Sequence, residues 1–449
     1  MNRNSLYSIS PLDGRYSEQV KELSQYVSEF AFLKYRVEIE LIYLRELSQA
    51  GVIRKFSLQE VSLVNDISKK FTIEDAKEIK DTEDRVKHDV KAIEYFLRDK
   101  LTQTSLKDIT RFIHFGITSE DVNNLAYGRM WKDLNDNQLI VELKVIIEKL
   151  SQIALVNKDS VMVARTHGQP AVPTTFGKEI AVYSNRLKKI LRSLEVLKFE
   201  GKINGAVGNY NALVFAYPKV DWIKFSKTFI KKLGLIPNLT TTQIIPGDIA
   251  VRYFQLLQLL NNILIGMVQD LWWYISLDYL KLRKNDQEVG SSTMPQKVNP
   301  IDFENAEGNL ELAIGILETF IRKFPKSRLQ RDLSDSTVKR SVGAAFGYTL
   351  VAWKSIERGL GKISFNTEFA LDELEVHYEV LAEAIQIHLK KQGDEEGFEK
   401  VKSLMRGQSI NKKEFNNIIK NIPALAEWKI DPKDYIGMAG KLVEAEKVI

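Results

Sequence analysis

Residues 139–153 have the sequence LIVELKVIIEKLSQI, which sets apolar side chains three and four positions apart, at Leu139, Leu143, Ile146, Ile147, Leu150 and Ile153. This spacing is typical of one face of an α-helix. The stretch belongs to a long segment without proline, between Pro11 and Pro170, that is rich in Leu, Ile, Glu and Lys, residues that favour helix. Strand-like alternation of apolar and polar residues is scarce. The sequence therefore predicts an all-α fold.

Further stretches of helical periodicity follow at 176–199, 249–282 and 303–324. Between them lie loops at 166–175, 201–211 and 290–300, which are marked by proline or glycine. Long helices joined by such loops predict an elongated central bundle, and their broad apolar faces predict an oligomer. We expect a helical N-terminal domain over 1–110, a central long-helix bundle and oligomerisation domain over 111–362, and a helical C-terminal domain over 363–449.

Composition narrows the classes of function. The chain of 449 residues has 64 Lys and Arg against 59 Asp and Glu, which leaves a net charge of +5. Charges so evenly mixed argue against a nucleic-acid-binding protein, whose basic residues cluster. Cysteine is absent, which excludes disulfides, thiolate metal sites and thiol nucleophiles. With only five histidines, a histidine-based metal site is not expected either.

One segment is long enough to raise the question of a membrane span. No charged residue lies between Arg252 and Asp270, and this length is close to the span of about 20 residues that a bilayer requires. Several Gln and Asn side chains interrupt the segment, and in lipid each amide would need a partner. We therefore expect a buried helix and no membrane contact. Residues 1–16 lack the apolar core of a secretory signal, which predicts a cytoplasmic protein.

The loop at 290–300 has the sequence GSSTMPQKVNP, with hydroxyls at Ser291 and Ser292 and a cation at Lys297. Backbone N–H groups outside a helix, together with a lysine, can surround an anion and hold a hydroxyl beside it. A polar turn between two helices with a chance lysine explains the same residues. From the chemistry alone, both interpretations stay open.

The segment 290–299 resembles the signature of the fumarase/aspartase superfamily. Three other stretches resemble the adenylosuccinate lyase family within it, and they are SPLDGRY at 10–16, RTHGQP at 165–170 and RDLSDSTVKR at 331–340. With HFGITSED at 114–121, the resemblance runs from residue 5 to about 440 and is closest to the longer bacterial form of the family. It implies an all-α homotetramer whose active sites are shared between subunits, with no metal or organic cofactor.

The resemblance also implies a reaction, the β-elimination of fumarate. The substrates would be adenylosuccinate, which gives AMP, and the succinyl-aminoimidazole-carboxamide ribotide of purine biosynthesis. Such a reaction needs a base for a weakly acidic proton, donors for the charge that builds up on a carboxylate, and an acid for the departing nitrogen. Histidine suits the acid best. By resemblance, Ser291 would be the base, His167 the acid, Lys297 a charge-stabilising group and His88 a further active-site residue.

By the same resemblance, a larger set would bind the substrate, and it consists of Arg15, Tyr16, Lys87, Asp89, Thr118, Ser119, Gln243, Ser292, Asn299, Asn305, Arg331, Ser336 and Arg340. Plainer explanations exist for several members. Thr118 and Ser119 would cap a helix, isolated arginines are usually surface residues, and His88 would lie on a helix with surface salt bridges. Lys87 and Gln296 depart from the pattern of the family.

Two rival functions remain from the sequence. One is another lyase of the superfamily, such as argininosuccinate lyase or fumarase, and the basic block at 331–340 argues against it because malate has no phosphate to bind. The other is a catalytically silent helical scaffold, against which the intact Ser291, His167 and Lys297 argue. His114 is expected near the site but outside the catalytic set, and His377 and His388 are expected to be structural.

Overall fold

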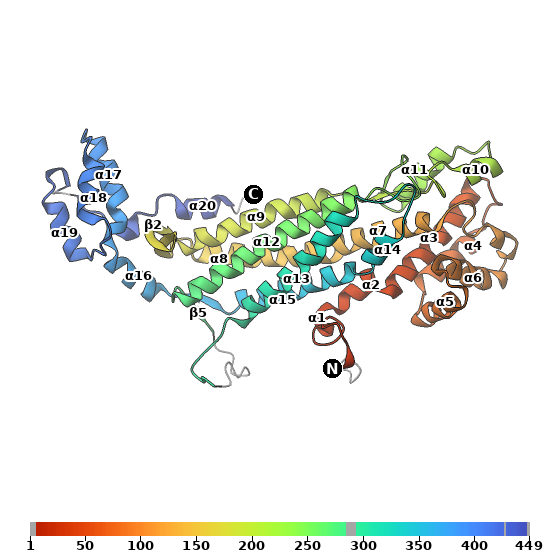
Figure 1. Ribbon diagram of the computed structural model, residues 1–449, viewed down its shortest axis with the longest axis horizontal. Coiled ribbons are helices and arrows are strands. Elements are labelled where there is room, and N and C mark those ends of the chain that lie inside the picture. The colour runs from red at the N-terminus through yellow and green to blue at the C-terminus, as the bar shows by residue number, and fades with distance from the viewer. Residues whose placement is uncertain (1–5, 284–292, 426–427, 447–449) are drawn as a thin grey trace. The chain divides into compact units, whose positions relative to one another are not determined.

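Helices make up most of the protein. The computed structural model describes residues 6–283, 293–425 and 428–446 (Figure 1). Within that part of the chain the strands are short, and the longest are β1, Val161–Thr166, and β2, Gln169–Thr175. The predicted all-α class is confirmed. Both strands were missed: the sequence analysis predicted a loop over 166–175, which includes β2, and assigned no strand to β1.

The structure has five long helices, and they are α8 (Ile140–Val156), α9 (Phe176–Val196), α12 (Asp248–Ser276), α13 (Ile301–Lys323) and α15 (Val342–Leu360). The first four correspond to the periodic stretches, whereas α15 was not predicted. The predicted stretch 249–282 is too long. Leu280–Leu282 forms strand β5, which pairs antiparallel with β6, Ile363–Phe365. The change from helix to strand follows Asp278, whose φ of 64° is left-handed and cannot continue an α-helix.

The chain forms two units. Unit 1 comprises residues 1–142, 192–261 and 309–351, and unit 2 comprises residues 143–191, 262–308 and 352–449. Every division between these segments falls inside one of the five long helices. The division predicted from the sequence, at 110 and 362, follows consecutive chain and stays a prediction.

Unit 1 contains, besides its parts of the long helices, α1 (Ser17–Val20), α2 (Ser24–Val27), α3 (Glu29–Gln49), α4 (Leu58–Lys69), α5 (Ile73–Val86), α6 (Asp89–Thr102), α7 (Ser119–Leu134), α10 (Asn211–Ala216), α11 (Trp222–Lys232) and α14 (Ser334–Lys339). Strands β3 (Glu200–Gly201) and β4 (Ile236–Pro237) form a parallel pair. Phe254 is fully buried and contacts the rings of Trp131, Phe320, Phe324 and Phe346. These aromatic side chains form the centre of the core of unit 1.

Unit 2 adds α16 (Thr367–Val376), α17 (Ala382–Lys391), α18 (Gly397–Met405), α19 (Lys412–Lys420) and α20 (Ala439–Glu446). Helices α17, α18 and α19 gather in the C-terminal part, which is blue in Figure 1. Tyr378, Leu381, Ile385, Leu389 and Phe415 belong to one buried apolar cluster there. The two histidines expected to be structural lie nearby, with the ring of His388 against Trp428 and His377 bonded to Glu379.

Helix α12 is the uncharged segment that the sequence placed inside the protein. In unit 1, Asn261 of this helix is fully buried and donates a hydrogen bond to Thr349 at 3.1 Å, while Gln255 is exposed to solvent. Of these two side-chain amides, the buried one has a hydrogen-bond partner and the other is in contact with solvent. None of the helices in the described ranges has the length and apolar character that crossing a membrane requires.

Candidate active site

A cavity of about 670 Å³ lies in unit 1. Residues of α3, α5, α6, α7, α14 and the start of α15 line it. Seven of the predicted site residues are among them, namely Lys87, His88, Asp89, Ser119, Arg331, Ser336 and Arg340. Sequence segments that are far apart therefore meet at one cavity.

The junction of α5 and α6 presents the first three of these residues. The plainer explanation of His88, a position within a surface helix, does not hold, because α5 ends at Val86 and Lys87 takes a left-handed φ of 56°. His88 is instead the N-cap of α6, and its Nδ1 accepts a hydrogen bond from the amide of Lys91 at 3.1 Å. An imidazole that accepts at Nδ1 carries its proton on Nε2. The cap thus fixes the tautomer of His88.

Asp89 is held by Arg36, a residue that the sequence analysis did not select. Arg36 is 2% exposed, and its Nη2 donates to Asp89 at 2.7 Å while its Nε donates to Asn123 at 2.9 Å. Burial by itself would raise the pKa of Asp89, but the charge of Arg36 and a hydrogen bond from the Val90 amide outweigh it. The pKa of Asp89 consequently lies below its ordinary value.

The start of α7 carries Thr118 and Ser119. Thr118 is the N-cap, and its amide donates to Asp121 Oδ2 at 2.8 Å, so the helix-capping explanation is correct for Thr118. Capping by the backbone does not exclude binding by the side chains. Ser119 lines the cavity, whereas Thr118 is not among its lining residues.

The segment 331–340 supplies half of the Lys and Arg residues that line the cavity. Arg331 donates from Nη1 to Gln243 at 3.1 Å, and its Nη2 lies 3.6 Å from the buried carboxylate of Glu120. Lys339 lies 3.7 Å from the same carboxylate. The structure thus brings Gln243, which was predicted with little support, next to Arg331.

Positive charge exceeds negative charge around the cavity. Its lining has six Lys and Arg residues (Arg36, Lys80, Lys87, Arg331, Lys339 and Arg340) against four Asp and Glu residues (Glu29, Glu83, Asp89 and Glu120). Among the described residues, Lys87 and Arg340 are exposed cations that form no ion pair. Their charge is available to an anionic ligand. The described part of the chain contains no group of three or more His, Asp or Glu residues that could hold a metal ion.

The N-terminal motif is in unit 1 but does not line this cavity. Arg15 is exposed and Tyr16 is half-buried at the N-cap of α1. Leu12 is buried against Gly347, where an added Cβ would come within 2.7 Å of its side chain. The motif is therefore attached to α15, and a binding role for Arg15 and Tyr16 stays a prediction.

His167 belongs to unit 2, where it lies at the tip of the hairpin formed by β1 and β2. Thr166 pairs with Gln169, and the two residues between them, His167 and Gly168, have φ values of 53° and 74°. Positive φ at both central positions is typical of a type I′ turn, which matches the twist of a two-stranded hairpin. The turn leaves His167 exposed.

The base of the hairpin is held by charged and hydroxyl groups of unit 2. Arg165 forms an ion pair with Glu373 of α16. The Tyr279 hydroxyl, which has a single proton to donate, contacts both Glu373 and, at 3.1 Å, the carbonyl oxygen of Val163. These contacts support the strand that carries His167 at its end.

The remaining predicted residues are in and around the signature loop. Ser291 and Ser292 lie outside the described residues. Lys297 is exposed, and its amide donates to the Met294 carbonyl at 3.1 Å, while Asn299 is half-buried. Asn305, on α13, accepts a hydrogen bond from Ser355 at 2.8 Å. Lys297, Asn299 and Asn305 belong to unit 2.

Comparison with known proteins identifies the family. The chain matches the lyase family over residues 14–315 and the adenylosuccinate lyase C-terminal family over residues 327–436. It is 43% identical to an adenylosuccinate lyase of Buchnera aphidicola subsp. Schizaphis graminum and 41% identical to that of Escherichia coli K12, in both cases over 100% of each chain. This chain belongs to the adenylosuccinate lyase family. The predicted family and its class of enzyme, a lyase, are confirmed.

Solved structures agree on the fold of the adenylosuccinate lyase family member. A fumarate lyase from Mesorhizobium sp. BNC1 superposes with a TM-score of 0.76 at 17% identity, over 96% of this chain and 97% of the other. A 3-carboxy-cis,cis-muconate lactonizing enzyme from Pseudomonas putida superposes with a TM-score of 0.77 at 20% identity, over 95% and 96%. At these identities the likeness concerns the fold.

Several residues around the cavity of this family member escaped the sequence analysis. Arg36 is buried inside α3, whose apolar pattern gives no sign of a functional cation. Asp121 was only the last residue of the motif at 114–121, and Lys202 was only part of the loop at 201–211, yet both are fully buried and lie 2.8 Å apart. Their pairing joins segments that no local pattern connects.

Proposed function

We propose that this chain is an adenylosuccinate lyase, which eliminates fumarate from adenylosuccinate to give AMP and from the succinyl-aminoimidazole-carboxamide ribotide in purine biosynthesis. Full-length identity of 41–43% to adenylosuccinate lyases supports the activity. The observation that supports this cavity as the site of the reaction is its basic lining, which includes Arg331, Arg340 and Lys87 together with Ser336. The enzyme would act in the cytoplasm without a metal or organic cofactor.

The substrate bears a phosphate and two carboxylates, and these groups call for cations and hydroxyls. Arg331 and Arg340 can each bind an oxyanion through two N–H groups, and Ser336 can add a hydroxyl. Ser119, at the start of α7, would bind a carboxylate of the succinyl group together with Thr118. His88 would offer its Nε2 proton to the substrate, because its Nδ1 is engaged by Lys91.

The chemical step in this proposal moves two protons. Ser291 removes the proton from the carbon beside a succinyl carboxylate, and the electron pair left behind forms the double bond of fumarate as the carbon–nitrogen bond breaks. His167 gives a proton to the departing nitrogen. Lys297 and Asn299 would stabilise the charge that accumulates on the carboxylate during this step. A serine base requires a stabilised alkoxide, which we attribute to Lys297.

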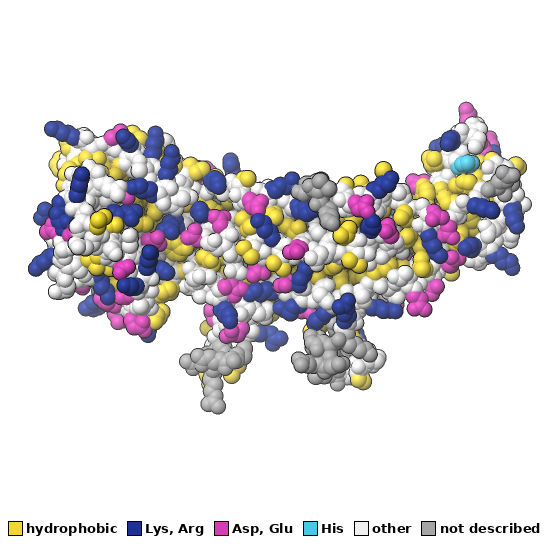
Figure 2. All heavy atoms as spheres, turned by 180° about the vertical axis from the view of Figure 1, so that it is seen from behind, with side chains coloured by type: hydrophobic (Ala, Val, Ile, Leu, Met, Phe, Trp, Pro, Cys, Tyr) yellow, Lys and Arg dark blue, Asp and Glu magenta, His cyan; other side chains and the backbone are white. Residues whose placement is uncertain are grey.

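We further propose a homotetramer whose active sites combine residues of several subunits. Apolar side chains are exposed on the long helices, including Leu259 (49% exposed) and Trp273 (57%) of α12 and Leu312 (54%) of α13. Apolar residues also lie among the charged ones on the face shown in Figure 2. Exposed apolar positions on long helices are typical of subunit interfaces. Residues from unit 1 of one subunit would then act with His167 and Ser291 of others.

The test is to incubate the purified protein with adenylosuccinate and follow the absorbance of the purine. We expect conversion to AMP and fumarate, and we expect no turnover of argininosuccinate or malate under the same conditions. Absence of any change with adenylosuccinate would favour the silent scaffold or a sister lyase. Ser291→Ala and His167→Asn, each in assembled protein, separate the two proton transfers, and His388→Asn is a matched control far from the proposed chemistry in sequence.

A further inference from the structure

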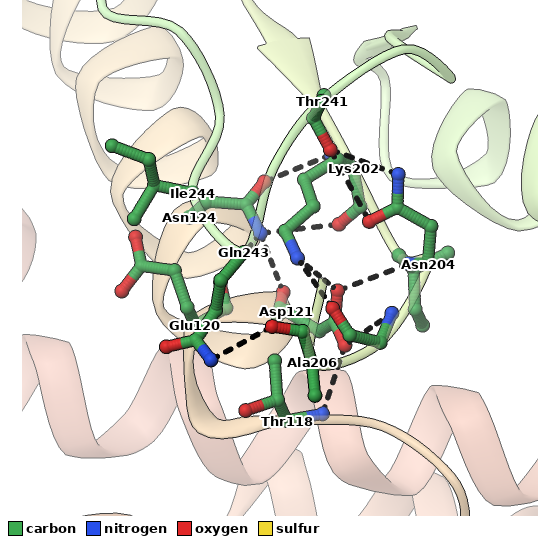
Figure 3. A network of polar contacts seen from close by, with 12 residues as sticks. Thr118, Glu120, Asp121, Asn124, Lys202, Asn204, Ala206, Thr241, Gln243 and Ile244 are labelled. Atoms are coloured by element: carbon green, nitrogen blue, oxygen red, sulfur yellow. Dashed lines mark hydrogen bonds and ion pairs between the residues drawn. The ribbon is translucent and has the colours of Figure 1, made fainter. Parts of the chain in front are cut away.

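Unit 1 contains a fully buried ion pair between Lys202 Nζ and Asp121 Oδ1, at 2.8 Å with neither side chain exposed (Figure 3). Removing two charges from water costs free energy that their attraction does not always recover, and apolar residues of similar volume are often as stabilising. A buried pair is therefore weak evidence for a role in stability. Its geometry indicates what else it does.

The Asp121 carboxylate accepts hydrogen bonds from three backbone amides besides Lys202. These come from Thr118 at 2.8 Å, Asn204 at 3.0 Å and Gly205 at 3.1 Å. Two carboxylate oxygens have about four acceptor positions. The four contacts thus occupy Asp121 and attach the turn before α7 to the loop at 202–206, where Gly205 has a φ of +84°.

The same loop connects to the basic side of the cavity. The carbonyl of Ala206 accepts a hydrogen bond from Gln243 Nε2 at 2.8 Å, and Gln243 accepts one from Arg331. Arg331 in turn lies near Glu120, the residue before Asp121. These contacts form a closed ring that starts and ends at the beginning of α7, part of which appears in Figure 3.

We propose that Lys202 and Asp121 are positioning residues for the lyase reaction. Neither residue lines the cavity, and neither side chain is exposed. They fix the backbone of Thr118, and so place the Thr118–Ser119 pair to bind a carboxylate of the succinyl group. This inference rests on the proposed function, since it assumes that the pair at 118–119 binds that group.

The test uses Lys202→Met and the charge-neutral double variant Asp121→Asn/Lys202→Met. Lys202→Met leaves Asp121 buried without its cation and is expected to lower the melting temperature. The double variant removes both charges, and its melting temperature is expected to return most of the way to that of the wild type. In both, inhibition of adenylosuccinate cleavage by fumarate should weaken at least about tenfold, the effect of losing a hydrogen bond to a charged group. Inhibition by AMP should change less than about threefold.

The comparison between the variants separates positioning from folding. If the double variant is as stable as the wild type and its fumarate inhibition is also restored, the pair is merely structural and the inference is overturned. An equal weakening of fumarate and AMP inhibition would overturn it as well. Lys232→Met is the matched control, because Lys232 pairs with Glu46 at 2.5 Å in the same unit and neither residue lines the cavity. Inactive wild-type protein would instead contradict the proposed function.

Discussion

Arg331 donates a hydrogen bond to Gln243 at 3.1 Å, and Gln243 is held in turn by the carbonyl of Ala206. The amide of Gln243 therefore fixes the direction of a guanidinium at the edge of the cavity. An arginine with its long side chain held in place binds an oxyanion at a smaller loss of conformational freedom than a mobile one.

Gln243→Met should release Arg331 and raise the KM for adenylosuccinate about two- to tenfold, because one hydrogen bond of ordinary strength is lost. The kcat should change less than the KM. Steady-state kinetics of the purified variant measure both constants. Gln152→Met, at an exposed glutamine of α8, is the control, and an unchanged KM in Gln243→Met would contradict the expected role.

His167→Asn should lower kcat by about 10²- to 10⁴-fold, the usual contribution of a general acid. Asparagine tolerates the left-handed backbone that this position requires, so the hairpin should survive and the melting temperature should stay close to that of the wild type. Thermal unfolding and turnover are measured on the same sample. Retention of more than about a tenth of the activity would argue against the acid role.

Arg36→Met should destabilise the protein at pH 7 by about 1 to 3 kcal/mol, the range for hydrogen bonds to charged groups. The pKa of Asp89 is below its ordinary value when folded, so the stability from this group is present above the unfolded pKa of about 3.9 and is lost as the pH falls through the folded pKa. The difference in unfolding free energy between wild type and variant should therefore shrink below about pH 4. A constant difference from pH 7 to pH 3 would contradict this origin.

Glu40→Gln should show the opposite dependence on pH. Burial opposes protonation of His114, but the charge of Glu40, whose Oε1 is 2.5 Å from Nδ1, outweighs it and raises the pKa of His114. Stability from a raised pKa is complete below the unfolded value of about 6.5 and is lost as the pH rises through the folded one. The variant should thus be more destabilised at about pH 5.5 than at pH 9, as urea unfolding at both values would show.

Leu259→Arg and Trp273→Arg test the proposed assembly. A charge at an apolar interface is costly because it is buried without a partner, so each variant should dissociate to smaller species and lose activity together with the tetramer. Sedimentation at several concentrations gives the size, and assays at the same concentrations give the activity. Dissociated subunits that remain fully active would contradict shared active sites.

Much of the fold could be predicted because periodicity is a local property. The stretch at 139–153 corresponds to α8, in which Leu143, Ile146, Ile147 and Leu150 are buried, and the start of α9 falls at Phe176 as the pattern indicates. The hairpin at 161–175 was missed because its strands do not alternate. Its turn depends on a left-handed conformation at His167, which is uncommon for residues other than glycine and cannot be read from composition.

Site residues that lie within long sequence motifs could be predicted. Site residues that are defined by contacts between distant parts of the sequence could not. Arg331, Ser336 and Arg340 lie in one recognisable block, and the structure places them at one cavity. Arg36 and Lys202 belong to no recognisable motif. Each matters because of an ion pair with a residue distant in sequence, Asp89 for Arg36 and Asp121 for Lys202. No local pattern carries that information. The break at Lys87 was also hidden, since a lysine rarely ends a helix in this way.

The chain passes between unit 1 and unit 2 inside α8, α9, α12, α13 and α15, so neither unit is a continuous stretch of polypeptide. A shortened gene therefore cannot encode one unit and omit the other. During synthesis, unit 1 is complete only after residue 351 and unit 2 only after residue 449, so neither can form from the N-terminal half of the chain alone. Because each unit consists of three separate chain segments, recombination cannot exchange one unit as an independent module.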